Sequence, residues 1–100
     1  MKVLKEGHLY GLESMEGTMS DQTIQFIEKA QIDGKFERLS DGTTNEEVLA
    51  MLINRLQFLQ AKAACRENAI VITKLEESLM WLNKRTADRK ARNVEGTAAK

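Results

Sequence analysis

Residues 44–60, TNEEVLAMLINRLQFLQ, carry the pattern that decides the fold of this chain. Thr44 and Glu47 have the spacing of a capping box, in which a hydroxyl and a carboxylate each accept a hydrogen bond from a backbone amide at the start of a helix. Apolar side chains then recur every third or fourth position, which is typical of one face of an α-helix. These side chains are Leu49, Leu52, Ile53, Leu56 and Leu59. The stretch predicts an amphipathic helix to about Gln60.

A second and longer helix is predicted from about Arg66 to Arg92. Its apolar stripe consists of Ile72, Leu75, Leu79 and Leu82. Only the link Ala61–Cys65 separates the two helices, and so short a link makes them antiparallel neighbours. Cys65, at the junction, is expected to be a small buried apolar residue.

The residues ahead of the helices indicate strands and turns. Asp33-Gly34 lies between the half-apolar runs Thr23–Ile32 and Lys35–Leu39. Such a pair is a strong hairpin signal, because both turn residues must adopt a positive φ. His8–Leu12 is a candidate for a further strand. A two-stranded hairpin is not stable alone in water, so it must pack on the helices or pair with another strand.

These elements predict an α+β fold with a short N-terminal β-hairpin segment at residues 1–43. A helical hairpin with a C-terminal tail follows at residues 44–100, within one compact domain. A domain this small buries only about 65% of its unfolded surface, so oligomerisation is a natural way to stabilise it. No apolar run approaches the roughly 20 residues that span a bilayer. No secretory h-region follows Met1-Lys2, so we expect a cytoplasmic protein without a membrane partner.

Catalytic and metal-binding chemistry find little support in the sequence. His8 is the single histidine and Cys65 the single cysteine, and they lie far apart in the chain. One histidine and one cysteine without ligand spacing do not predict a zinc site. The sequence contains neither a GxGxxG motif nor a P-loop. We therefore expect a non-enzymatic protein without a metal or a cofactor.

The second helix carries a polar and aromatic stripe beside its apolar face. Arginine forks bind phosphate oxygens through paired hydrogen bonds, and an indole ring can stack on a base. Residues 84–92 hold five basic side chains against one acidic side chain. At about 100° per residue, one side of the helix presents such groups: Lys74, Ser78, Trp81, Arg85, Arg89 and Arg92. The stripe favours a flat ligand that bears phosphate.

Other interpretations of these residues stay open. The helix dipole alone favours basic side chains near a helix C-terminus. Asp88 and Arg92 have the spacing of an ordinary surface ion pair. Trp81 is either a stacking surface for a base, a core residue or a contact with another subunit.

The tail Val94–Thr97 also allows two interpretations. Gly96 lets backbone amides approach a ligand closely, and Thr97 supplies a hydroxyl. Alternatively, Asn93 or Gly96 ends the helix in a left-handed cap. The last residues fray unless something holds them.

Three segments together resemble the hairpin domain of phage-encoded cyclic-nucleotide sponges: DGTTNEEVL (41–49), CRENAIVITKLEESLMWLNKRTADRKAR (65–92) and VEGT (94–97). Proteins of that family counter the bacterial CBASS and Thoeris immune systems. The resemblance implies a protein that binds and sequesters cyclic nucleotide signals in the host cytoplasm without turning them over. The expected ligands are cyclic di- or trinucleotides or cyclic ADP-ribose isomers. It also implies a homo-oligomer, with a hexamer the expected form and ligand pockets between subunits.

The resemblance assigns roles to particular residues. Arg85 and Arg89 match helix arginines that hold ligand phosphates in the anti-Thoeris branch. Phe58 and Asn68, which flank the link, match positions that line a pocket. The glycine and threonine of the tail are similar to a segment that the anti-CBASS branch uses for cyclic oligonucleotides. Trp81 and Arg92 are added from the helix stripe. The predicted ligand site is therefore Arg85, Arg89, Phe58, Asn68, Gly96, Thr97, Trp81 and Arg92.

A rival interpretation comes from a different class of protein. The chain would be a small structural or regulatory phage protein whose helices form an oligomeric bundle. Its basic helix ends would contact DNA or a host protein. Acidic and basic residues both number 15, and this even balance disfavours nucleic acid as the partner.

Overall fold

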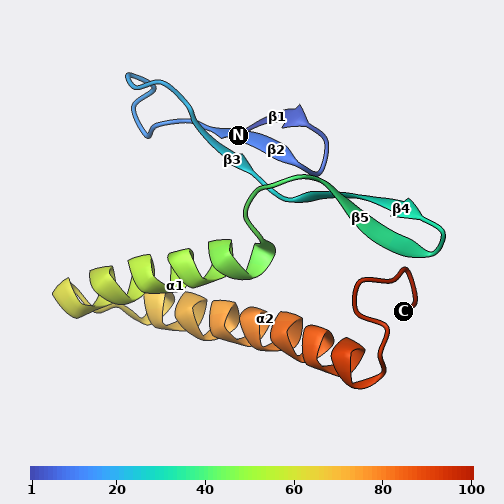
Figure 1. Ribbon diagram of the computed structural model, residues 1–100. Coiled ribbons are helices and arrows are strands. Elements are labelled where there is room, and N and C mark those ends of the chain that lie inside the picture. The colour runs from blue at the N-terminus through green and yellow to red at the C-terminus, as the bar shows by residue number, and fades with distance from the viewer. The chain divides into compact units, whose positions relative to one another are not determined.

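The computed structural model describes residues 1–100 as five strands followed by two helices (Figure 1). The α+β fold class is therefore confirmed. In chain order the elements are β1 (Lys2–Lys5), β2 (Leu9–Leu12), β3 (Gln22–Gln25), β4 (Glu28–Ile32), β5 (Lys35–Ser40), α1 (Asn45–Lys62) and α2 (Arg66–Ala91). Neither helix is long and apolar enough to cross a membrane.

The chain divides into two compact units. The first contains residues 1–44 together with residues 96–99, and the second contains residues 45–95 with Lys100. Most of the tail thus groups with the strands, although it follows α2 in the sequence.

The hairpin predicted at Asp33-Gly34 is confirmed. The two residues have φ of 52° and 75°, as a two-residue turn between twisted strands requires, and they join β4 to β5. The tail pairs with this hairpin, because Phe36 N donates to Gly96 O at 3.0 Å and Ala98 N donates to Gly34 O at 2.9 Å. The expected need for a further strand is therefore met by the far end of the chain.

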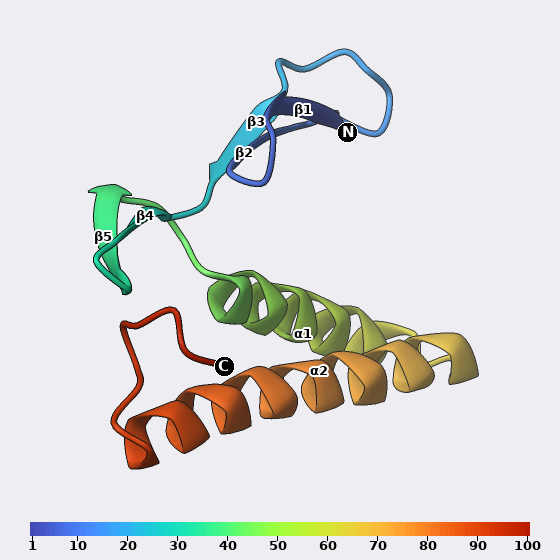
Figure 2. The same ribbon diagram turned by 90° about the vertical axis from the view of Figure 1, so that its right-hand side faces the viewer.

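The candidate strand at His8–Leu12 is present as β2, and the N-terminal part is larger than the short hairpin region that the sequence predicted. β1, β2 and β3 form an antiparallel sheet in that order, and a long loop joins β2 to β3 (Figure 2). The run Thr23–Ile32 was expected to be one strand, and this was wrong. The chain leaves the first sheet at Phe26, whose N–H donates to His8 O at 2.8 Å. Phe26 also forms a parallel bridge with Thr43, and Ile27 N donates to Thr43 O at 3.0 Å, so from here the chain pairs with a segment that is not part of the first sheet.

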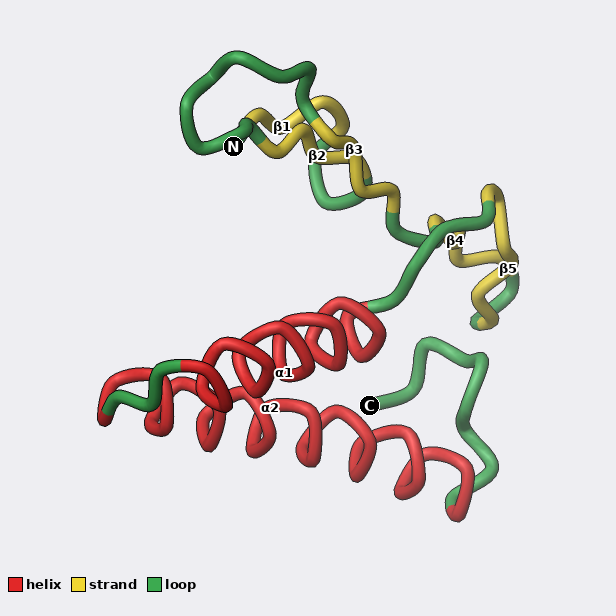
Figure 3. Tube along the Cα trace, turned by 90° about the vertical axis from the view of Figure 1, so that its left-hand side faces the viewer, coloured by secondary structure: helices red, strands yellow, loops and turns green.

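The helical hairpin is confirmed, with a link of three residues, 63–65, between antiparallel helices (Figure 3). α1 begins at Asn45, which places Thr44 at the N-cap position. Cys65 is exposed, so the prediction of a buried cysteine was wrong. It is the N-cap residue of α2, and its Sγ accepts a hydrogen bond from Asn68 N at 3.4 Å. A capping side chain lies at the helix end, where solvent reaches it.

The two predicted apolar stripes are the least exposed rows of apolar side chains on the helices. Ile53 is the single buried apolar residue, and the other members are half-buried apart from Leu52, which is 39% exposed. Large apolar side chains remain open on the helices, among them Met51, Phe58, Ile70, Val71, Met80 and Trp81. A hairpin with so small a core leaves apolar surface that another molecule could cover.

Candidate functional site

The predicted ligand residues occupy three places in the chain. Phe58 and Asn68 lie near the link, the arginines lie toward the end of α2, and Gly96 and Thr97 lie in the tail. Asn68 and Arg85 are both on α2, and at 1.5 Å per residue their backbones are about 25 Å apart. One copy of the chain therefore does not bring the link residues and the helix arginines together.

The link end presents an exposed aromatic ring next to a cation. Phe58 is 54% exposed, and Lys62 Nζ lies 4.8 Å from the centroid of its ring. Lys62 follows Phe58 by one helical turn, a spacing that places two side chains on the same face. That spacing was available in the sequence, but the prediction did not include Lys62. Asn68 is half-buried.

The C-terminal half of α2 exposes Trp81 and Arg85. The indole is 56% exposed, which excludes the core interpretation of Trp81 within one chain. Arg85 is exposed, and its guanidinium has no ion pair or hydrogen bond within the chain. The two residues are four positions apart, and residues at that spacing are neighbours on a helix surface. Together they offer a stacking ring and an uncompensated cation.

The alternative ion pair between Asp88 and Arg92 does not form. Asp88 instead pairs with Lys84, one turn earlier, with 3.3 Å between Oδ2 and Nζ. Arg92 remains exposed, and its Nη1 donates to the carbonyl oxygen of Lys100 at 2.7 Å.

Arg89 differs from the other arginines because it is buried. Its side chain is 7% exposed. Nε donates to Glu95 Oε2 at 3.2 Å, and Nη2 donates to Val94 O at 3.0 Å. The helical periodicity placed Arg89 on the same stripe as Arg85. It did not predict that Val94 and Glu95, just after the helix, would contact Arg89 and bury it.

The chain reverses direction immediately after α2. Asn93 has φ of 58°, and its N–H donates to Lys90 O at 3.1 Å. Val94 N donates to Arg89 O at 2.9 Å. This pair of hydrogen bonds around one left-handed residue is the Schellman motif, so the left-handed cap predicted for Asn93 or Gly96 is confirmed at Asn93.

The tail beyond the reversal follows the β4–β5 hairpin. Thr97 forms an antiparallel bridge with Lys35, and its Oγ1 accepts from Ala99 N at 3.2 Å. Gly96 has φ of 82°, a conformation that side chains rarely adopt. The glycine therefore has a structural reason to be there, whether or not it contacts a ligand.

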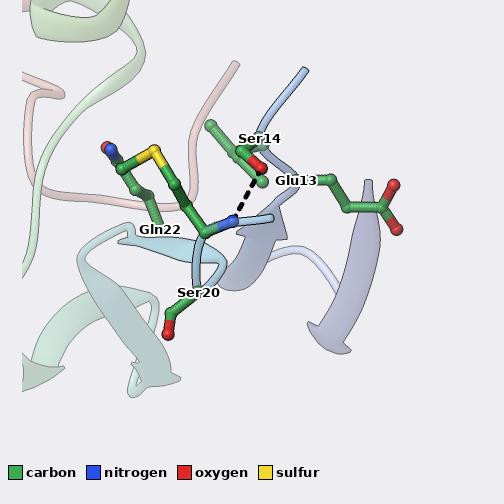
Figure 4. Close-up of a pocket in the computed structure, with 6 residues that line it drawn as sticks. Glu13, Ser14, Ser20 and Gln22 are labelled. Carbon is green, nitrogen blue, oxygen red and sulfur yellow. Dashed lines mark hydrogen bonds between the residues drawn. The ribbon is translucent and has the colours of Figure 1, made fainter. Parts of the chain in front are cut away.

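A separate hollow of about 270 Å³ lies at the loop between β2 and β3. It is lined by Leu12, Glu13, Ser14, Met19, Ser20 and Gln22. Met19 N donates to Ser14 Oγ at 3.3 Å, and the Glu13 carboxylate points away from Ser14 and Gln22 (Figure 4). None of the predicted ligand residues lines this hollow.

Two clear pKa changes occur in the chain, and both belong to ion pairs among the strands. A hydrogen bond to Asp21 raises the pKa of Lys2, and a hydrogen bond from Lys5 lowers the pKa of Glu28. The lysine of each pair is exposed and its carboxylate is half-buried, and both are contacts between strand residues on the surface, so they indicate structural contacts and not a reactive centre. No cluster of three or more metal-ligating side chains is present.

Comparison with known proteins places half of the predicted ligand residues in a recognised domain. A family model described as the Acb2/Tad1 hairpin domain matches residues 28–87. The match includes Phe58, Asn68, Trp81 and Arg85, and it ends before Arg89 and the tail.

A curated relative, "Thoeris anti-defense 1" of Bacillus phage SBSphiJ7, is 58% identical over 65 residues. The alignment covers 64% of this chain and 46% of the relative, so the chain spans about half the length of the curated relative it matches. Since the family model matches more than half of the chain, the chain belongs to the Acb2/Tad1 hairpin-domain family.

Proposed function

We propose that this protein is a sponge that binds and sequesters cyclic nucleotide immune signals in the host cytoplasm and so blocks antiphage defence. The observation that carries the proposal is the exposed pair Trp81 and Arg85, which lies inside the matched domain. The guanidinium has no acidic partner in the chain, and a phosphodiester would supply one. The name of the phage relative, which describes an anti-defence protein, supports a role against host defence.

The proposed ligand is cyclic and carries both phosphates and bases. A phosphodiester ring presents two or three negative charges, which suits Arg85 and Arg92 at the end of α2. Its bases suit the exposed rings of Trp81 and Phe58, because base–aromatic stacking contributes about 1–3 kcal/mol per base. Cyclic dinucleotides, cyclic trinucleotides and cyclic ADP-ribose isomers all have this chemistry.

A complete pocket would be built from more than one copy of the chain. About 25 Å of helix separates Asn68 from Arg85, so a compact ligand that contacts both must contact two subunits. The exposed apolar side chains of the helices support assembly, because a second copy would cover them. We propose a homo-oligomer, with the hexamer as the expected form.

Binding is proposed to occur without turnover, metal or cofactor. His8 belongs to the first unit and Cys65 to the link in the second, and no hydrogen bond joins their side chains. Sequestration lowers the concentration of free signal by binding alone. Its effect is therefore set by the affinity of the protein for the signal and by the number of copies of the protein.

A mixing experiment tests the proposal. The protein is incubated with cyclic dinucleotides, cyclic trinucleotides and cyclic ADP-ribose isomers, and native mass spectrometry reports subunit number and bound ligand together. The protein is then removed by proteolysis, and chromatography measures what returns. We expect intact ligand in stoichiometric amounts. Degraded ligand would make the protein an enzyme, and no binding to any member of the panel would reject the sponge. Duplex DNA binding that falls steeply with salt, without cyclic nucleotide binding, would favour the DNA-contacting bundle.

A further inference from the structure

Lys62 lies over the exposed ring of Phe58 and forms no ion pair in the chain. We propose that Lys62 is a further ligand-binding residue. Its ammonium leaves the ring to pair with a ligand phosphate, while a base of the same ligand stacks on Phe58. The inference rests on the proposed function and deepens it, because it adds a phosphate-binding group at the link end of the helical hairpin.

The place of Lys62 follows from helix geometry. Long side chains on a helix lean toward its N-terminus, so a lysine one turn after a phenylalanine lies above the ring. Lys62 Nζ is 4.8 Å from the ring centroid, and Phe58 is still 54% exposed. Three other lysines, Lys2, Lys5 and Lys84, each pair with a carboxylate. The charge of Lys62 is met by an aromatic ring instead, so it is available to an anion.

The sequence around this ring is positively charged. Residues 48–66 contain three basic side chains and no acidic one. The dipole of α1 favours a cation in the last turn, and it would account for a lysine at position 62. It does not account for an exposed aromatic ring beside that lysine. A cation next to a stacking surface is the combination that recognises a phosphorylated base.

The contact between Lys62 and Phe58 is weak enough to be exchanged for a ligand. A cation–π contact at an exposed site is weaker than a charge-assisted hydrogen bond to phosphate. The four-carbon stem of lysine is flexible, so the ammonium can move off the ring without a change in the backbone. A base then takes the face of the ring that the ammonium has left. Both side chains exchange a weak contact for a stronger one.

Lys62 also gives the link end of the hairpin a cation of its own. The link residue Asn68 and the cation Arg85 are separated by about 25 Å of helix. In a pocket built from two subunits, Lys62 of one copy would hold one phosphate and Arg85 of another copy would hold the next. Such an arrangement suits a ligand with two or more phosphates, which all three proposed ligand classes are.

Isothermal titration with a cyclic dinucleotide, a cyclic trinucleotide and a cyclic ADP-ribose isomer tests the contact. For the probes that the wild type binds, we expect Lys62→Gln to weaken binding about five- to tenfold, as loss of one exposed charge-assisted contact would do. Lys62→Arg keeps the charge and should stay within about threefold of the wild type. High salt should narrow the difference between the wild type and Lys62→Gln. Native mass spectrometry verifies that the oligomer is unchanged.

The control for net charge is Lys29→Gln. Lys29 is an exposed lysine of β4 that forms no ion pair. Its loss changes the charge of the protein by the same amount as Lys62→Gln, and it should leave affinity unchanged. Equal losses in the two variants would make the effect one of overall charge and would overturn the contact.

A variant of the ring separates a direct phosphate contact from simple support of Phe58. Phe58→Leu removes the aromatic face and keeps an apolar side chain at an exposed position. If Lys62 binds phosphate, Lys62→Gln should weaken binding several-fold in the Phe58→Leu background as well, because separate contacts are close to additive. If Lys62 only holds the ring, Lys62→Gln has no further effect in that background, and the proposed contact is rejected.

The remaining outcomes also decide between the hypotheses. Equal affinity of the wild type and Lys62→Gln would remove Lys62 from the site. Tighter binding by Lys62→Gln would show that the ammonium only blocks the ring against a base. In both cases the wild type still binds, so the sponge stands without this contact. A wild type that binds no probe rejects the sponge and the role of Lys62 together.

Discussion

The side-chain amide of Gln60 is hydrogen-bonded to both main-chain polar groups of Cys65. Its Oε1 accepts from Cys65 N at 3.0 Å, and its Nε2 donates to Cys65 O at 2.9 Å. The amide thereby holds the N-cap residue of α2 in place from the end of α1. Because Cys65 also caps α2 through Sγ, the two contacts together set the course of the link.

Gln60→Ala should destabilise the helical hairpin by about 1–2 kcal/mol, because each of two hydrogen bonds contributes roughly 0.5–1.5 kcal/mol. Gln60→Glu keeps the hydrogen-bond acceptor and loses the donor, so it should lower the free energy of unfolding by less than Gln60→Ala does. Urea unfolding followed by circular dichroism measures both. Gln57→Ala, at an exposed position of α1, is the control. Equal stability of the wild type and Gln60→Ala would show that the link does not depend on this amide.

Gly42→Ala should be more destabilising than Gly7→Ala. A Cβ at position 42 would lie 2.5 Å from the backbone carbon of Phe26, so the backbone must shift. Position 7 has open space around a Cβ, and there only the positive φ of 77° opposes alanine, at about 1–2 kcal/mol. Thermal unfolding of the two variants gives the order. The reverse order would mean that the segment at Gly42 moves freely away from Phe26.

Asn93→Gly should stabilise the end of α2 slightly, and Asn93→Ala should destabilise it by about 1 kcal/mol, because alanine tolerates the left-handed conformation least. Hydrogen exchange at the Val94 amide, which donates to Arg89 O, follows the turn directly. Faster exchange in Asn93→Gly than in the wild type would contradict the backbone argument and point to a side-chain role for Asn93.

Arg85→Ala should weaken binding of the proposed cyclic nucleotide at least about tenfold, as loss of a charge-assisted phosphate contact would do. Lys90→Ala, which removes another exposed cation of α2, should have a much smaller effect. Isothermal titration gives the affinity, and native mass spectrometry verifies that the oligomer is intact. If both variants bind like the wild type, the site does not include this arginine.

The Lys5–Glu28 pair should make the stability of the strand unit depend on pH at acidic values. The hydrogen bond from Lys5, at 2.7 Å, lowers the pKa of Glu28 in the folded state. Folding is therefore favoured by this pair above the unfolded pKa, and the contribution is lost as pH falls through the folded pKa. Glu28→Gln should flatten that part of the stability–pH curve. Because the Lys5 ammonium is exposed to solvent, the effect should shrink in high salt. If Glu28→Gln leaves the acidic part of the stability–pH curve unchanged, Glu28 does not contribute to the pH dependence of stability.

The helical hairpin and the turn between β4 and β5 could be predicted from the sequence because their signals are local. The spacing of Ile72, Leu75 and Leu79 and the turn residues Asp33-Gly34 each specify a structure within a few positions. The sheet of β1, β2 and β3 has no such signal. Its strands have four residues each, too few for a clear alternation, and pairing over a long loop depends on contacts that a periodic pattern does not record.

In the candidate site, too, the features that follow from local periodicity could be predicted, and those that depend on contacts with other segments could not. Periodicity placed Trp81 and Arg85 on one side of a helix, and the structure leaves both exposed. The burial of Arg89 depends on the turn at Asn93 and on the carboxylate that this turn brings back. The exposed position of Cys65 likewise depends on a side chain five residues earlier, since Gln60 holds its main chain.

The pairing of residues 96–99 with β5 has a consequence for synthesis. The strand unit contains residues from both ends of the chain, and the helices are inserted between them. On the ribosome, the helical hairpin can form as soon as it emerges, because all of its contacts are local. The β4–β5 pair must wait until residues 96–99 have been translated before its partner arrives. Until then it has an unpaired strand edge, so the nascent chain is most open to pairing with other copies before residues 96–99 emerge.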